Sequence, residues 1–118
     1  MPTSLRATAV AVVLLASPAF AADANRGREL FTACAACHTG KADALGPSLA
    51  GVVGRRSASL DDYRYSPPMK RAGLVWDAAT LKSYLADPQA KVPGNRMPFA
   101  GLAPADIDDV LAYLATLK

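Results

Sequence analysis

Apolar residues recur at helical spacing in the C-terminal part of the chain. Their i, i+3, i+4, i+7 spacing places them on one face of a helix that begins near Pro104. Ala103 is a poor N-cap residue, so the sequence defines the first turn of this helix less sharply than the rest. The face consists of Ile107, Val110, Leu111 and Leu114, with Tyr113 and Leu117 beside it.

Three further helices are predicted upstream. Residues 23–36 are rich in alanine and suit a helix. A short helix follows Ser66, which is an N-cap residue before proline, and stops at Gly73. Another begins at the N-cap residue Asp77 and ends before Pro88. The apolar faces hold Leu30, Phe31 and Cys34 in the first helix and Leu81, Tyr84 and Leu85 in the last.

Long segments without strand character separate these helices. Residues 38–76 and 89–103 are rich in glycine and proline and show no sustained alternation of apolar and polar positions. Loops of this length are uncommon in compact domains unless they carry function. The pattern therefore predicts an all-α domain with functional loops.

The N-terminal segment differs from the rest of the chain. An apolar run at residues 7–16 follows Arg6, and the small-residue end at residues 19–21 suits cleavage. The run is too short to span a bilayer comfortably, which disfavours a retained membrane anchor. We therefore predict that residues 1–21 are a cleaved secretory signal peptide. Residues 22–118 would then form one exported, soluble domain in the periplasm, with no stable membrane insertion.

Length and charge narrow the function. The 118 residues allow one small domain, and the formal net charge of +3 is too low for nucleic-acid binding by bulk electrostatics. Basic residues fall in the middle of the chain and aspartates near its end. This distribution predicts either a molecule with one basic face or an ordinary solvated surface. The basic group is Arg55, Arg56, Arg64, Lys70, Arg71, Lys91 and Arg96, and the acidic group is Asp106, Asp108 and Asp109.

The most informative string is C-A-A-C-H at residues 34–38. On this spacing, two thiols can form thioethers with the two vinyl groups of haem while the adjacent imidazole reaches the iron. A zinc site needs four ligands, but the chain has two cysteines and one histidine. A thioredoxin-like dithiol needs a preceding strand in a βαβ pattern, which the sequence lacks. We therefore predict one covalent haem c on Cys34 and Cys37, with His38 as an axial ligand.

The second axial ligand cannot be a histidine, because His38 is the only one. Met97 lies in a loop between two predicted helices, and thioether ligation favours reduced iron. Met69 is the alternative, although a methionine in a short helix usually packs in the core. With both axial positions filled, the iron would exchange electrons and leave no site for a substrate. A labile sixth position would instead indicate a haem-based gas or peroxide sensor, or a small peroxidase.

Short motifs beyond C-x-x-C-H occur along the chain: Gly27 with Phe31, Gly46-Pro47-Ser48-Leu49, Gly54-Arg55, Gly73-Leu74-Val75-Trp76, Tyr84-Leu85 with Pro88, and Pro93-Gly94-Asn95-Arg96-Met97. With them the chain resembles the class I c-type cytochromes, such as mitochondrial cytochrome c and bacterial cytochrome c2, over essentially all of residues 22–118. The resemblance implies the cytochrome c fold, in which three main helices, short helices and long loops surround a covalent haem. It also implies an electron carrier and not an enzyme.

The same resemblance suggests roles near the iron. Met97 would be the second axial ligand. The carbonyl of Pro47 would accept a hydrogen bond from the far nitrogen of His38, which orients the imidazole. The hydroxyl of Tyr84 would meet the Met97 sulfur, and Phe99 would close the haem crevice.

Further roles concern the haem propionates and the helix contact. Trp76 and Tyr65 resemble the residues that donate hydrogen bonds to a buried propionate, and Arg55 would offset its charge. Asn95 stands where the family usually has a small hydroxyl near the propionate. Gly27, with Phe31 and Tyr113, resembles the crossing of the first and last helices, where glycine lets two backbones approach.

The expected partners follow from the resemblance. They are membrane redox complexes, such as a cytochrome bc1-type donor and a terminal oxidase or reaction-centre acceptor, or a periplasmic dehydrogenase. A monomer would meet their acidic patches in weak, salt-sensitive encounters through basic residues that include Lys41, Lys91 and Arg96. The lysines of the mitochondrial docking face are thinned here, because Gln89 and Ala90 follow Pro88. This departure leaves the identity of the partner open.

Overall fold

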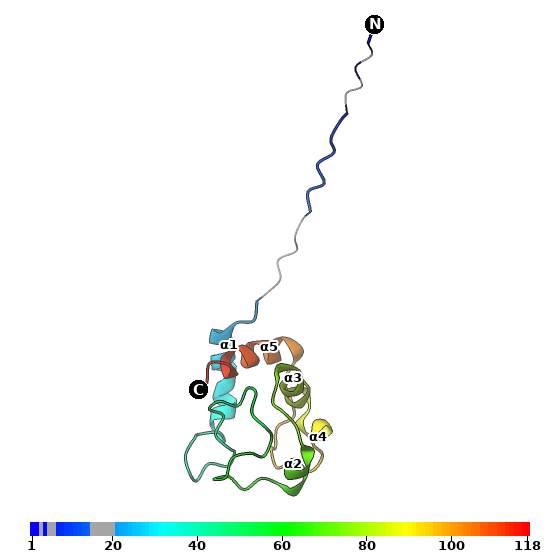
Figure 1. Cartoon of the computed structure of the whole chain (residues 1–118). Helices are drawn as coiled ribbons and strands as arrows, with labels where there is room; N and C mark the ends of the chain where they lie inside the picture. The colour runs from blue at the N-terminus through cyan, green and yellow to red at the C-terminus, as the bar shows by residue number, and fades with distance from the viewer. Residues whose placement is uncertain (3, 5–6, 15–20) are drawn as a thin grey trace.

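The structure is a computed structural model that describes residues 1–2, 4, 7–14 and 21–118. Residues 3, 5–6 and 15–20 of the predicted signal peptide lie outside the described residues, and with them most of its predicted cleavage end at residues 19–21. Residues 7–14 have no regular secondary structure and lead away from the domain as an extended segment (Figure 1). Their apolar side chains are exposed, so they add nothing to the core.

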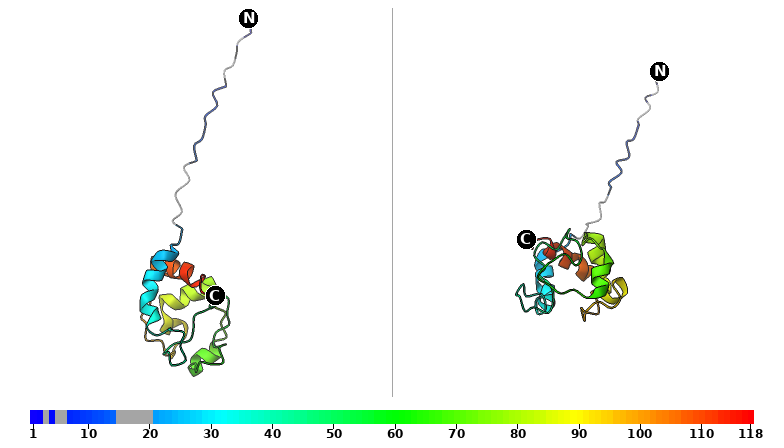
Figure 2. Two further views of the ribbon diagram at one scale, coloured as in Figure 1. Left: turned by 90° about the vertical axis from the view of Figure 1, so that its left-hand side faces the viewer. Right: turned by 60° about the horizontal axis from the view of Figure 1, so that its bottom comes forward.

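Five helices form within the described residues, and no strand does. They are α1 (Ala24–Ala35), α2 (Pro67–Ala72), α3 (Ala78–Ala86), α4 (Pro88–Lys91) and α5 (Pro104–Leu114). Helices α1, α3 and α5 gather at one end of the domain, whereas α2 and α4 lie toward the other end among the loops (Figures 1 and 2). The all-α prediction is therefore confirmed. None of the helices in the described part of the chain is long and apolar enough to cross a membrane.

Side-chain caps set where most helices begin. The carboxylate of Asp23 accepts hydrogen bonds from the backbone nitrogens of Asn25 and Arg26, at 2.9 and 3.2 Å. Ser66 caps α2 and Asp77 caps α3 in the same way. Helix α5 begins at Pro104 as predicted, although Ala103 makes no side-chain cap. Proline suits the first turn because that turn needs no backbone N–H donor.

Helix α4 corrects the sequence prediction of a loop starting at Gln89. The Asp87 side chain accepts a hydrogen bond from the backbone nitrogen of Ala90 at 3.1 Å, and Pro88 occupies the first turn. One short turn offers no apolar periodicity, so only the cap and the proline could have indicated it. Pro88 therefore follows the end of α3 and also starts α4.

Helices α1 and α5 cross where Gly27 meets the backbone of α5. A Cβ atom at this glycine would overlap the carbonyl of Asp109 and lie 3.0 Å from Cβ of Tyr113. Beside this contact, the rings of Phe31 and Tyr113 lie 5.0 Å apart between centroids. The two helices lie across each other in both views of Figure 2. The predicted crossing is confirmed, and with the Phe31–Tyr113 contact it packs α1, which carries Cys34 in its last turn, against α5.

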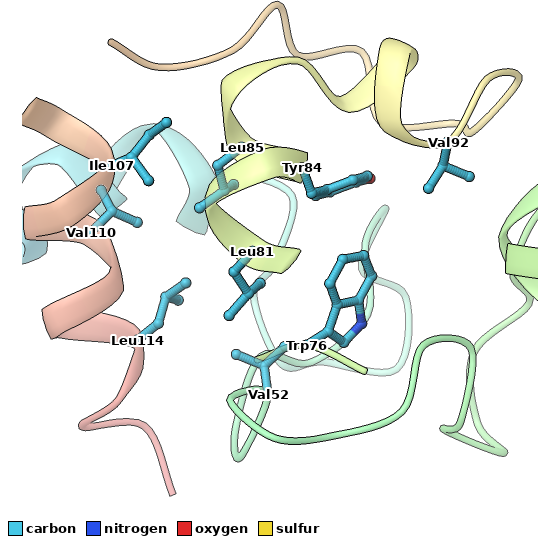
Figure 3. Packing of buried hydrophobic residues seen from close by; sticks show 9 residues of the cluster. All are labelled: Val52, Trp76, Leu81, Tyr84, Leu85, Val92, Ile107, Val110 and Leu114. Carbon is cyan, nitrogen blue, oxygen red and sulfur yellow. The ribbon is translucent and has the colours of Figure 1, made fainter. Parts of the chain in front are cut away.

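The buried core lies between α3, α5 and the loop before α3 (Figure 3). The indole of Trp76 and the phenol ring of Tyr84 pack at a centroid distance of 4.9 Å. These aromatic rings link the helical end of the domain to its loops. The cluster comprises Val52, Trp76, Leu81, Tyr84, Leu85, Val92, Ile107, Val110 and Leu114.

The acidic group near the end of the chain is paired with cations. Asp106 and Asp109 contact the guanidinium of Arg26 at 2.6 and 2.7 Å. Asp108 contacts Lys82 at 2.8 Å. The aspartates therefore do not form a free acidic face. The separation between the basic residues in the middle of the chain and these aspartates is smaller than the sequence suggests.

Candidate haem site

A cavity of about 570 Å³ lies between the end of α1, the long loop before α3 and the segment after α4. Its volume is in the range of small-molecule and cofactor sites, and most of its lining is apolar. Every site residue singled out in the sequence reaches this cavity. They are Cys34, Cys37, His38, Pro47, Arg55, Tyr65, Trp76, Tyr84, Asn95, Met97 and Phe99; Met69 lines it as well.

Cys34 lies in the last turn of α1 and Cys37 in the turn just beyond it, and both line the cavity. The backbone nitrogens of Cys37 and His38 donate to the carbonyl of Cys34, at 3.1 and 2.9 Å. Neither cysteine is in a disulfide. Burial, together with the neighbouring Cys37, raises the pKa of the Cys34 thiol. A reactive redox dithiol requires the opposite shift, so this environment disfavours thioredoxin-like chemistry.

The imidazole of His38 is oriented by one hydrogen bond. Its Nδ1 lies 2.7 Å from the carbonyl oxygen of Pro47. Since a carbonyl only accepts, Nδ1 carries the proton and donates it, and the lone pair of Nε2 remains available to a metal. Gly46 packs so closely that its Cβ would lie 2.7 Å from Cε1 of the ring. The ring is therefore held both by a hydrogen bond and by contact.

Met97 lies in the segment after α4, with its sulfur next to a phenol. The hydroxyl of Tyr84 donates to Sδ of Met97 at 3.5 Å. Burial, with a smaller contribution from Tyr63, raises the pKa of Tyr84 to about 12. The phenol therefore keeps its proton and its role as donor at physiological pH.

The side chain of Asn95 binds backbone groups around Met97. It lines the cavity, but its amide nitrogen donates to the carbonyls of Pro88 and Val92, each at 2.9 Å. Its amide oxygen accepts from the backbone nitrogen of Met97 at 2.8 Å. Gln89 also binds this segment. In the sequence it was notable only because it stands where the mitochondrial proteins have a lysine of the docking face. For Asn95 a signal was present, because an asparagine in a Gly- and Pro-rich loop commonly binds nearby backbone groups.

A polar corner of the cavity suits an anion. Arg55 is half-buried and donates to the carbonyls of Ala50 and Ser48, at 3.0 and 2.8 Å. Its Nε is buried and has no hydrogen-bond partner among the described residues. The hydroxyl of Tyr65 accepts from the backbone nitrogen of Leu60 at 3.3 Å, which leaves its own proton free to donate. These donors fit the carboxylates of a haem.

The donor set and the fold together define a c-type cytochrome. Two thiols at C-x-x-C-H spacing, an oriented imidazole and a thioether reach one apolar cavity of an all-α domain. In the described part of the chain, His, Cys, Asp and Glu side chains form no cluster of three or more that could hold a metal ion by themselves. The residues thus fit an iron carried by haem and do not fit a zinc site.

Comparison with known proteins agrees with this class. The sequence model of the family described as Cytochrome c matches residues 24–118. Cytochrome c2 iso-2 of Magnetospirillum molischianum is 49% identical over 100 residues, which cover 82% of this chain and 100% of that protein. Cytochrome c2 of Rhodoblastus acidophilus is 44% identical over 102 residues, or 83% of this chain and 95% of that protein.

A solved structure shows the same fold. Cytochrome cH from Methylobacterium extorquens superposes with a TM-score of 0.76 at 46% identity, covering 80% of this chain and 98% of that one. The chain belongs to the cytochrome c family. It is therefore a monohaem electron carrier with covalently bound haem c, and it is not an enzyme. The predictions of fold, cofactor and general function are confirmed, and the sensor or peroxidase alternative is set aside.

Proposed function

We propose that residues 22–118 act in the periplasm as a carrier of single electrons, after removal of residues 1–21. The donor would be a cytochrome bc1-type complex and the acceptor a terminal oxidase or a reaction centre. The observation that carries the proposal is the single cavity shared by the C-x-x-C-H string and Met97. Relatives named cytochrome c2 support the class of carrier. The mass of the purified periplasmic protein tests the cleavage, which is expected before Ala22.

Each residue near the iron has one task in this proposal. Haem c supplies an iron that alternates between the ferric and ferrous states. Cys34 and Cys37 anchor the group, so it cannot be lost outside the cytoplasm. His38 offers Nε2, because its Nδ1 is held by Pro47 at 2.7 Å. Met97 offers its sulfur as the second ligand.

The remaining cavity residues set the surroundings. Arg55, Tyr65 and Trp76 would meet the propionates; the buried Nε of Arg55 and the free proton of Tyr65 support this assignment. Tyr84 withdraws electron density from the Met97 sulfur through its hydrogen bond. Phe99 lines the cavity two residues after Met97 and would limit the access of water.

Two methionine variants test the ligand assignment, because Met69 and Met97 line the same cavity. We expect Met97→Ala to abolish the methionine-to-iron charge-transfer band of the ferric protein, to lower the midpoint potential and to let the ferrous protein bind carbon monoxide. Met69→Ala is the matched control and should retain the band and exclude carbon monoxide. If Met97→Ala keeps the band and Met69→Ala loses it, the assignment is wrong.

Charge at the rim of the cavity supports docking to acidic partners. Arg96 is exposed and lines the cavity beside Met97, and Lys91 is exposed on α4. Such charges mainly raise association rates and are screened by salt. We expect Arg96→Gln to slow electron transfer to an acidic partner at low ionic strength and to weaken its salt dependence. Arg28→Gln is the control, because it removes the same charge from an exposed residue of α1 that does not line this cavity. Equal effects of the two changes would contradict docking at the rim.

A further inference from the structure

The backbone that carries Met97 is held by the buried side chain of Asn95. Only 8% of Asn95 is exposed. The backbone N–H of Met97 can only donate, and it lies 2.8 Å from one side-chain atom of Asn95, which must therefore be the amide oxygen. The other atom is then the amide nitrogen, and it donates one proton to Pro88 and one to Val92, each at 2.9 Å. Both amide protons are used within the segment.

This arrangement leaves Asn95 unable to serve a propionate. A carboxylate needs a donor, and both donors of the Asn95 side chain already bind carbonyls. Its contacts instead connect the first residue of α4, the end of α4 and Met97. A movement of the segment away from α4 would break the hydrogen bond to Pro88, and a movement of Met97 relative to Asn95 would break the one to the Met97 nitrogen.

Gln89 makes a second set of contacts across the same segment. Its amide nitrogen donates to the carbonyl of Asn95 at 3.0 Å and lies 3.4 Å from the carbonyl of Met97. Its amide oxygen accepts from the backbone nitrogen of Gly94 at 3.3 Å. The side chain is exposed and two of these distances are long, so each bond is weaker than those of Asn95. Neither carboxamide titrates, so this restraint does not depend on pH near neutrality.

We infer that Asn95 and Gln89, here called the carboxamide pair, hold the Met97 segment closed and thereby set how readily an external ligand replaces the Met97 sulfur. Both are positioning residues, since they act through the backbone of Met97. The inference rests on the proposed ligation by Met97. It reassigns Asn95 from the propionate to the axial ligand, and it gives Gln89 a role.

The affinity of the ferric holoprotein for imidazole tests this inference, because imidazole binds the iron only when the Met97 sulfur has left it. The apparent affinity of an external ligand scales with the fraction of molecules in which the segment is open. We expect Asn95→Ala to raise the imidazole affinity about tenfold, since it leaves the backbone N–H of Met97 without its partner and removes one of the two donors to each carbonyl of Pro88 and Val92. Asn95→Ser retains one donor and one acceptor, so it should lie between Asn95→Ala and the wild type. Gln89→Ala should raise the affinity by about twofold to threefold, because its bonds are exposed.

A displaced carboxamide provides the matched control. The double variant Gln89→Ala/Ala90→Gln keeps the composition but moves the side chain to the next position on α4. We expect it to bind imidazole as tightly as Gln89→Ala alone. Recovery of the wild-type affinity would show that the exact contacts of Gln89 are unimportant and would overturn its role.

The two proposals fail in different ways. If Met97→Ala binds imidazole no more tightly than the wild type, the ligation by Met97 is wrong. If Met97→Ala binds it more tightly while Asn95→Ala and Gln89→Ala match the wild type, the carboxamide pair has no such function. A propionate partner would instead change only the pH dependence of the midpoint potential in Asn95→Ala. Should Asn95→Ala not mature with haem, the exposed Gln89→Ala decides the question.

Discussion

Gly46 offers the sharpest test of how the structure holds the His38 imidazole. A Cβ at this position would lie 2.7 Å from Cε1 and 2.8 Å from Nδ1 of the ring, whereas ordinary contact begins at 3.4 Å. Gly46→Ala would therefore displace the ring or the loop by about 0.7 Å. The ring has little freedom to yield, because Nδ1 donates to Pro47 at 2.7 Å and Nε2 is the proposed iron ligand.

The change in the free energy of unfolding of Gly46→Ala is the sum of two opposing effects. Overpacking a site of this kind costs about 1–3 kcal/mol. The backbone φ of Gly46 is not positive, so alanine adds no conformational strain and stabilises by about 0.4–1 kcal/mol through the unfolded state. We expect a net loss of about 1–2 kcal/mol. For a domain of this size, that loss lowers Tm by roughly 5–15 °C.

Denaturant and thermal unfolding of the ferric holoprotein measure this loss, and the midpoint potential reports on the ring. Gly51→Ala is the comparison, since that glycine has φ +67° and no atom within 4 Å of its Cβ. Gly51→Ala should lose stability through backbone strain alone and keep its potential. The reasoning is refuted if Gly46→Ala is as stable as the wild type and has the same potential.

Three further outcomes are expected. Gly27→Ala should lower the free energy of unfolding by about 2 kcal/mol or more, because its Cβ would overlap the carbonyl of Asp109; urea denaturation that shows a gain would contradict the tight crossing. The hydrogen bond from the backbone nitrogen of Asp23, and after it the Arg26 guanidinium, hold the pKa of Asp109 below its usual value. The ionised Asp109 carboxylate therefore stabilises the fold fully above about pH 4, and this stabilisation is lost as the pH falls through the lowered pKa. The difference in free energy of unfolding between the wild type and Asp109→Asn should therefore shrink in acid. Tyr84→Phe should lower the midpoint potential by about 20–60 mV, because one hydrogen bond to the Met97 sulfur is lost; voltammetry that shows no change would exclude this contact.

Local features of the sequence determined the helices and the haem attachment. Cap residues, prolines and apolar spacing act within a few neighbouring positions, so α1, α2, α3 and α5 were predictable. The spacing of Cys34, Cys37 and His38 is equally local, because one turn of chain brings the three side chains together. Helix α4 escaped prediction since a single turn has no apolar period.

Tertiary structure decided which polar groups meet. Asp106 and Asp109 of α5 pair with Arg26, which lies 83 positions before Asp109 in the chain, and no local rule anticipates such a pair. The position of Asn95 in the sequence does not tell whether its side chain binds a haem propionate or backbone groups. Its donors bind the carbonyls of Pro88 and Val92 because α4 turns the chain back toward Met97. A hydrogen bond depends on the path of the intervening backbone, and only the folded loop defines that path.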